Sequence, residues 1–246
     1  MTFEFAGASG EDMLCTTSDC FVYVGTYSGG PSRGVNLYCF ATATGTLARK
    51  GLAAQSAAPS FLAVSPNHRY LYAANEICHY DGQKSGSVSA FSIERETSKL
   101  RLLNVIASGD TGPVHLTVDH TGKYVLVANY GIGSVAFFSI LADGRLGEAT
   151  AHLPHAGHSV NASRQKEPHA HAIYVSPDNR FAVSPDLGTD QVYVYRFDAA
   201  LGTLEPNRPP FVTVTPGTGR RYLAFDSRGR FAYLVQEFGG ILTVFS

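Results

Sequence analysis

The stretch AVSPNHRYLYAANE, residues Ala63–Glu76, decides the fold because its pattern returns three more times along the chain. Each copy has an apolar residue, a polar turn, a basic residue followed by an aromatic one, a short apolar run and a polar end. Repeats spaced by roughly 50 residues and built from short strands are typical of β-propellers. The other copies are TVDHTGKYVLVANY (Thr117–Tyr130), YVSPDNRFAVSPDL (Tyr174–Leu187) and AFDSRGRFAYLVQE (Ala224–Glu237).

A second pattern lies between these copies and reads as a strand, a polar turn and the start of another strand. Together the two patterns predict a four-stranded blade, which can bury its faces only against neighbouring blades. The chain holds about five such blades, so we expect an all-β, β-propeller domain over residues 21–246. The second pattern occurs as VNLYCFATATGTL (Val35–Leu47), SVSAFSIERETSKL (Ser87–Leu100), SVAFFSILADGRL (Ser134–Leu146) and VYVYRFDAALGTL (Val192–Leu204).

The two ends of the chain indicate an open ring. The segment FVYVGTYSGG (Phe21–Gly30) resembles the last part of the first pattern, and ILTVFS (Ile241–Ser246) resembles a shortened copy of the second. Because propellers hide their strand edges by closing the ring, we expect the chain to end before ring closure. We also expect residues 1–20 to form a disordered tail. A ring that closes with five blades is the alternative.

Composition argues against several classes of protein. The formal net charge is -1, so no basic field is available to hold nucleic acid. No apolar run is long enough to span a membrane. The N-terminal residues lack the basic segment and apolar core of a secretory signal. We therefore expect a cytoplasmic protein whose 4 cysteines are free thiols. With no tryptophan, no repeat carries the WD dipeptide of interaction-scaffold propellers.

Residues 149–168, ATAHLPHAGHSVNASRQKEP, form an insertion relative to the other blades. The stretch is polar and weakly patterned, and it carries His152, His155 and His158. Long loops on rigid scaffolds often build binding sites. A solvated loop with incidental histidines is the alternative.

The repeat register selects candidate site residues. His171 and Arg221 occupy the same position in neighbouring copies, and Glu237 ends the strand that follows Arg221. Equivalent positions in successive blades face the same region around the propeller axis. We therefore expect these residues at one mouth of the central channel. At such a position an arginine can bind an acidic substrate, and a histidine or glutamate can transfer protons.

Several alternatives stay open for the remaining polar residues. His169 and His171 would share one face of a strand, where they could ligate zinc, bond turn carbonyls or take part in proton transfer. Glu76 is a turn cap or a substrate-binding group. His115 is a substrate-binding channel residue or a half-buried histidine. Asp186, next to the end of the third copy, is a further candidate for substrate binding.

Taken together, four stretches resemble the family of seven-bladed propeller lactonases, which includes bacterial-type 6-phosphogluconolactonase and the fungal carboxy-muconate lactonizing enzyme. The resemblance runs over residues 21–246. The stretches are PSFLAVSPNHRYLYAANE, GPVHLTVDHTGKYVLVANY, EPHAHAIYVSPDNRFAVSPDLGTDQVYVY and GRRYLAFDSRGRFAYLVQE.

The resemblance implies catalytic roles for His171, with His169 beside it, for Arg221 and for Glu237. It implies a hydrolase that acts on a small anionic lactone, above all 6-phosphogluconolactone in the pentose phosphate pathway. It also implies that no metal and no organic cofactor is required.

The chain departs from the family pattern at Arg220, Tyr222 and Gln236, where the family has proline, histidine and asparagine. Family members also carry two further blades that help to form the pocket, and any site residue supplied there is absent from this chain. Two other functions stay open. One is an isomerase that forms or opens a muconate-type lactone without net hydrolysis. The other is a non-catalytic, truncated propeller that serves as a binding scaffold.

Overall fold

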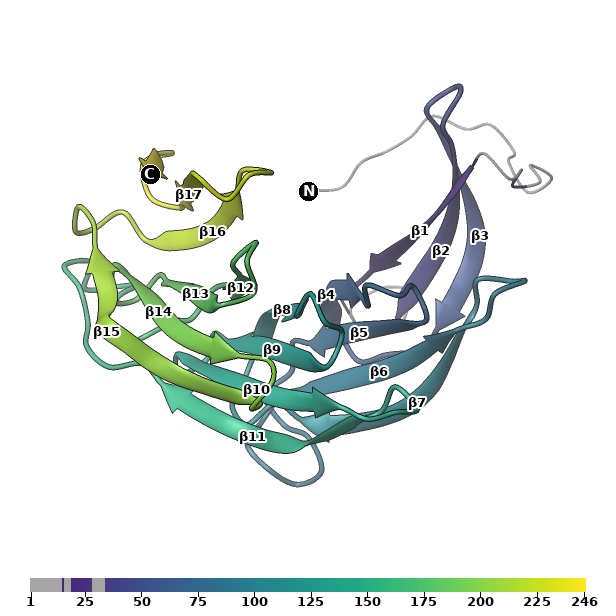
Figure 1. The fold of residues 1–246 in the computed structure, drawn as a ribbon, viewed down its shortest axis with the longest axis horizontal. Helices are drawn as coiled ribbons and strands as arrows, with labels where there is room; N and C mark the ends of the chain where they lie inside the picture. Colours follow the sequence, from purple (N-terminus) through teal and green to yellow (C-terminus); the bar gives the residue numbers. More distant parts are fainter. Residues whose placement is uncertain (1–14, 16–18, 28–33) are drawn as a thin grey trace.

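The computed structural model describes residues 15, 19–27 and 34–246, and these residues form five antiparallel β-sheets. The sheets follow one another around a curve, from the purple N-terminal sheet to the yellow C-terminal sheet (Figure 1). The described part of the chain contains no helix that could span a membrane. The predicted all-β architecture of stacked blades is confirmed. The tail predicted over residues 1–20 lies outside the described residues, apart from Cys15, Asp19 and Cys20.

Consecutive strands pair within each sheet, so every blade is an antiparallel meander. The first two sheets contain β1 (Cys20–Gly25), β2 (Val35–Ala41) and β3 (Thr46–Ala54), then β4 (Pro59–Val64), β5 (Tyr70–Asn75), β6 (Ser87–Ile93) and β7 (Leu100–Ala107). The third contains β8 (Pro113–Val118), β9 (Tyr124–Asn129), β10 (Ser134–Ile140) and β11 (Leu146–Pro154). The last two contain β12 (Tyr174–Val175), β13 (Phe181–Asp186), β14 (Gln191–Asp198) and β15 (Thr203–Thr213), then β16 (Arg220–Phe225), β17 (Ala232–Gln236) and β18 (Leu242–Phe245).

One polar side chain closes the turn of each repeat copy, which explains why the first pattern recurs. The Ser65 hydroxyl accepts a hydrogen bond from the Tyr70 amide at 3.0 Å. A carboxylate oxygen of Asp119 accepts one from the Tyr124 amide at 2.9 Å. Side chains that bind turn amides in this way hold the turn and fix where the next strand begins. The same bond joins Ser176 to Phe181 and Asp226 to Phe231.

Apolar side chains from neighbouring sheets pack together and hold the blades side by side. Leu126 and Phe137 of the third sheet share a buried cluster with Ile173 and Tyr195 of the fourth. Similar clusters join the first sheet to the second, the second to the third and the fourth to the fifth. Strands in the middle of a blade are therefore covered on both faces, as stacked blades require.

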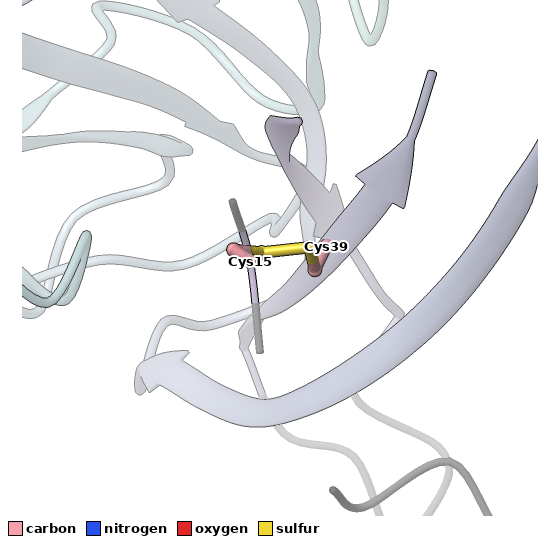
Figure 2. The surroundings of a disulfide bond; sticks show 2 residues. All are labelled: Cys15 and Cys39. Atoms are coloured by element: carbon pink, nitrogen blue, oxygen red, sulfur yellow. A yellow bond between two sulfur atoms is a disulfide. The ribbon is translucent and has the colours of Figure 1, made fainter. Parts of the chain in front are cut away.

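One disulfide bond contradicts the expectation of four free thiols. Cys15 is bonded to Cys39 of β2, and their Cα atoms are 6.0 Å apart (Figure 2). Cys39 is fully buried, whereas Cys20 and Cys78 are free and exposed. The sequence spacing gave no sign of this pair because only the fold brings the two cysteines within bonding distance.

The insertion over residues 149–168 is more ordered than its composition predicted. Its first part belongs to β11, which continues to Pro154 and completes the third sheet. Farther along, Gln165 is fully buried, and its side-chain Nε2 donates a hydrogen bond to the carbonyl oxygen of Leu187 at 2.8 Å. The segment is therefore not merely a solvated loop, and it holds the residues that it carries against the fourth blade.

The packing between blades predicts a large loss of stability when it is disturbed. Leu126→Ala should lower the free energy of unfolding by about 2–5 kcal/mol, because it leaves a cavity between two sheets. Leu201→Ala, whose side chain is 76% exposed, should change it by less than about 0.5 kcal/mol. Chemical denaturation of both variants measures the difference. Equal effects would contradict a core that lies between the sheets.

Candidate active site

A β-bulge opens the inner strand of several blades at the position that the repeat register selected. In the fifth sheet Arg220 pairs with Gln236, and the next pair skips Arg221. Ser60 of β4 and Val114 of β8 are skipped in the same way. In the fourth blade Ala170 forms an isolated bridge, and His171 follows it before β12 begins. Because a bulge re-aims one side chain, this position can direct its residue toward the inner mouth of the propeller.

Arg221, at the bulge of the fifth sheet, forms an ion pair with Glu237. The Nη1 group of Arg221 donates to one carboxylate oxygen of Glu237. Arg164, from the insertion, donates from Nη2 to the other oxygen at 2.9 Å. Burial opposes ionisation of Glu237, but the hydrogen bonds and charges of the two arginines outweigh it, so the pKa of Glu237 lies below its ordinary value. Glu237 is therefore ionised, with both oxygens engaged.

His171 is a buried imidazole beside this ion pair. It is 7% exposed and lies edge-on to the rings of Tyr130 and Tyr222, with centroids 5.5 and 5.3 Å away. Within the described residues its Nδ1 atom has no hydrogen-bond partner. Burial, helped by the positive charge of Arg221, lowers the pKa of His171 to about 4. The ring is therefore neutral near pH 7 and able to accept a proton.

His169 contacts the same tyrosine from another side. Its ring stacks on Tyr130 with centroids 4.4 Å apart and planes 10° apart. Its Nδ1 atom lies 2.8 Å from the Tyr130 carbonyl oxygen, so we assign Nδ1 as the donor and Nε2 as the nitrogen with the lone pair in the neutral ring. Tyr130 therefore brings the two histidines of the His-x-His pair together.

Asp186 lies behind the site and supports it. Its side chain has no exposed surface. One of its oxygens lies 2.6 Å from Nδ1 of His155, and the other accepts hydrogen bonds from the amides of His169 at 3.0 Å and Thr189 at 2.9 Å. Asp186 thus holds the backbone of His169, and its role in substrate binding stays a prediction. His155, from the insertion, is buried with it and stacks on Tyr193.

His115 is buried between aromatic rings of the second and fourth blades, and its role in substrate binding stays a prediction. It is 2% exposed and packs against the rings of Phe61 at 3.9 Å and Tyr174 at 4.7 Å. Its Nδ1 atom accepts a hydrogen bond from the amide of Ile173 at 3.3 Å. Burial, with a smaller contribution from His171, lowers the pKa of His115 to about 3.

Glu76 lies on the second blade, at the position that Glu237 occupies on the fifth. Its carboxylate accepts a hydrogen bond from the Tyr27 hydroxyl at 2.8 Å. Burial and the neighbouring carboxylate raise the pKa of Tyr27 to about 12. The structure therefore shows Glu76 as a half-exposed carboxylate held by a tyrosine.

The structure brings His169, His171, Arg221 and Glu237 together, and it adds two residues that sequence reasoning did not select. In the aligned repeats Tyr130 stands at the position of Glu237, but a tyrosine at that position does not indicate a particular reaction. Arg164 sits in the insertion, which has no counterpart in the other repeats, so no register could select it. Among the described residues, no group of three or more His, Cys, Asp and Glu side chains is arranged to hold a metal ion.

Comparison with known proteins adds an independent finding. A family model described as a lactonase with a seven-bladed β-propeller matches residues 21–246. The 6-phosphogluconolactonase of Bacillus subtilis is 32% identical over 215 residues, which cover 87% of this chain and 59% of that protein. The 6-phosphogluconolactonase of Formosa agariphila is 26% identical over 227 residues, which cover 92% of this chain and 64% of that protein.

A solved structure shows the same arrangement of blades. The periplasmic gluconolactonase of Pseudomonas aeruginosa matches with a TM-score of 0.83 and 33% identity, covering 93% of this chain and 64% of that one. The chain thus spans about three fifths of the length of the relatives it matches.

Burial of His115 predicts a loss of stability in acid. Below pH 6.5 the unfolded chain binds a proton at His115 that the folded chain does not bind until about pH 3, so stability falls as the pH decreases through this window. We expect His115→Asn, which keeps an acceptor for the Ile173 amide, to show a smaller drop in Tm between pH 6.5 and 4. The exposed His79→Asn should match the unaltered chain. A drop as large in His115→Asn as in the unaltered chain would contradict this account.

Proposed function

We propose that this chain, which belongs to the family of seven-bladed β-propeller lactonases, carries a lactone hydrolase site that converts 6-phosphogluconolactone to 6-phosphogluconate. The relatives named 6-phosphogluconolactonase support this substrate. The observation that carries the proposal is the neutral, buried ring of His171 beside an arginine that Glu237 holds in place.

In the proposed reaction, His171 accepts a proton from a water molecule whose oxygen attacks the lactone carbonyl carbon. The Arg221 guanidinium donates hydrogen bonds to the oxyanion that forms. The bond between the carbonyl carbon and the ring oxygen then breaks, and the leaving alkoxide takes the proton that His171 accepted from water, or a proton from Nε2 of His169 when that ring holds protons on both nitrogens. The products are a free hydroxyl group and a carboxylic acid that releases its proton to solvent and becomes a carboxylate, so the atoms of one water molecule are accounted for.

Glu237 suits an orienting role better than the role of base. Its pKa is lowered and both of its oxygens accept hydrogen bonds from arginines. Its negative charge instead fixes the direction of the Arg221 guanidinium. As negative charge develops on the oxyanion, the effect of Arg221 on His171 weakens and the imidazole becomes more basic.

The other functions raised by the sequence are not favoured by any observation. The intramolecular lactonizing reaction and the non-catalytic scaffold stay alternatives. A cytoplasmic location also stays a prediction, since the Pseudomonas aeruginosa relative is described as periplasmic and a disulfide joins Cys15 to Cys39.

Removal of the proposed base should abolish most of the activity. We expect His171→Ala to lower kcat for 6-phosphogluconolactone by about 10²–10⁴-fold without unfolding the chain. Hydrolysis in ¹⁸O-labelled water should place the label in the product carboxylate, which excludes an intramolecular reaction. The exposed His79→Ala is the matched control. Unchanged turnover in His171→Ala would rule out this base.

The charge of Arg221 should be measurable at His171. NMR titration of the histidine rings should give His171 a pKa near 4 in the unaltered chain. In Arg221→Met the pKa should move upward, because a positive charge that disfavours the imidazolium is gone. Arg196→Met, on the outer surface, is the control. An unchanged titration of His171 in Arg221→Met would show that the two groups do not interact.

A further inference from the structure

Arg164 is held at the site by a structured turn. The amide of Gln165 donates to the carbonyl oxygen of Asn161 at 2.8 Å, and the side chain of Gln165 accepts from the Asn161 amide at 3.0 Å. The Ser159 hydroxyl donates to Asp190 at 2.6 Å. Gln165 is fully buried. A turn anchored on both sides of Arg164 presents its guanidinium in one direction and reduces the entropy lost on binding.

Arg164 and Arg221 each form an ion pair with a different oxygen of the Glu237 carboxylate. Nη2 of Arg164 also donates to the Tyr130 hydroxyl at 3.3 Å, and its guanidinium lies 5.3 Å from the centroid of the Phe238 ring. The side chains of Arg164 and Arg221 are 45% and 39% exposed, so both are partly open to solvent. Two cations and one carboxylate leave a net positive charge, which attracts an anion.

The two arginines offer one cation for each of two polar groups of a phosphorylated sugar lactone. One carboxylate and two hydrogen bonds separate the guanidinium groups. A six-membered sugar lactone that is phosphorylated on C6 presents two separate polar groups, the carbonyl group and the phosphate. Arg221 lies beside His171 and is therefore placed to meet the carbonyl group. Arg164 lies on the other side of Glu237 and is placed to meet the phosphate.

We infer that Arg164 is the specificity-determining residue of this site and binds the phosphate of the lactone, while Arg221 acts at the carbonyl. A planar guanidinium binds phosphate oxygens with two parallel hydrogen bonds. The inference rests on the proposed function and names the residue that selects a phosphorylated lactone over the same lactone without phosphate.

The test compares Arg164→Gln and Arg164→Lys on 6-phosphogluconolactone and on gluconolactone. Arg164→Gln should lower kcat/KM for the phosphorylated lactone by about 10- to 100-fold more than for gluconolactone, mainly through KM, because loss of the hydrogen bond to Glu237 affects both lactones and loss of the phosphate contact affects only one. Arg164→Lys, which keeps the charge, should restore part of the loss. Arg196→Gln is the matched control, because this arginine pairs with Glu205 at 3.0 Å on the exposed surface.

Calorimetric titration with 6-phosphogluconate and with gluconate adds a readout that needs no turnover. Arg164→Gln should weaken binding of 6-phosphogluconate much more than binding of gluconate. Equal losses of kcat/KM for both lactones would overturn the inference, because they would show that Arg164 only holds Glu237 in place. Unchanged kcat/KM for both lactones would overturn it as well. If the unaltered chain binds 6-phosphogluconate selectively through Arg164 but hydrolyses neither lactone, the proposed function fails and the inference stands.

Discussion

The β-bulge at the start of the inner strand is the constraint on which the site depends. In a regular strand the side chain at that position would project from a face of the sheet into the packing between blades. The bulge turns it aside instead. Because the turns and strands of each repeat set the same register, the skipped positions of successive blades recur at the same level. A histidine placed there on the fourth blade and an arginine on the fifth become neighbours, although 50 residues separate them in the sequence.

Burial and charge then give these neighbours different states. Packing against Tyr130 and Tyr222 removes water from His171, and the nearby guanidinium of Arg221 opposes its protonation. For Glu237 the neighbouring charges favour the ionised form instead, because two arginines lower the pKa of its carboxyl group. The candidate site therefore combines a neutral imidazole, fixed positive charge and an ionised carboxylate. This combination suits attack of water on a carbonyl group next to an anionic substituent.

The fold and the centre of the site followed from the repeats, because each copy carries its own turn and strand signals and aligned copies must occupy equivalent places. His171, Arg221 and Glu237 were found in this way, and their roles stay predictions. Arg164 could not be predicted from the repeats, because it lies in an insertion that no other blade shares. Asp186 shares the register of a mouth residue, but its side chain is buried beneath His169. The pair Cys15–Cys39 depends on a contact between distant segments, which no spacing encodes.

The central claim is that residues of adjacent blades form one lactone site within this chain. A crystal structure of the chain with bound 6-phosphogluconate tests it most directly. The account predicts that the carboxylate of the product lies against His171 and Arg221, and that its phosphate lies toward Arg164. Product bound elsewhere, for example in the groove between the β12–β13 turn at Ser176 and the β16–β17 turn at Arg228, would contradict it, as would absence of product from His171 and Arg221 at saturating concentration.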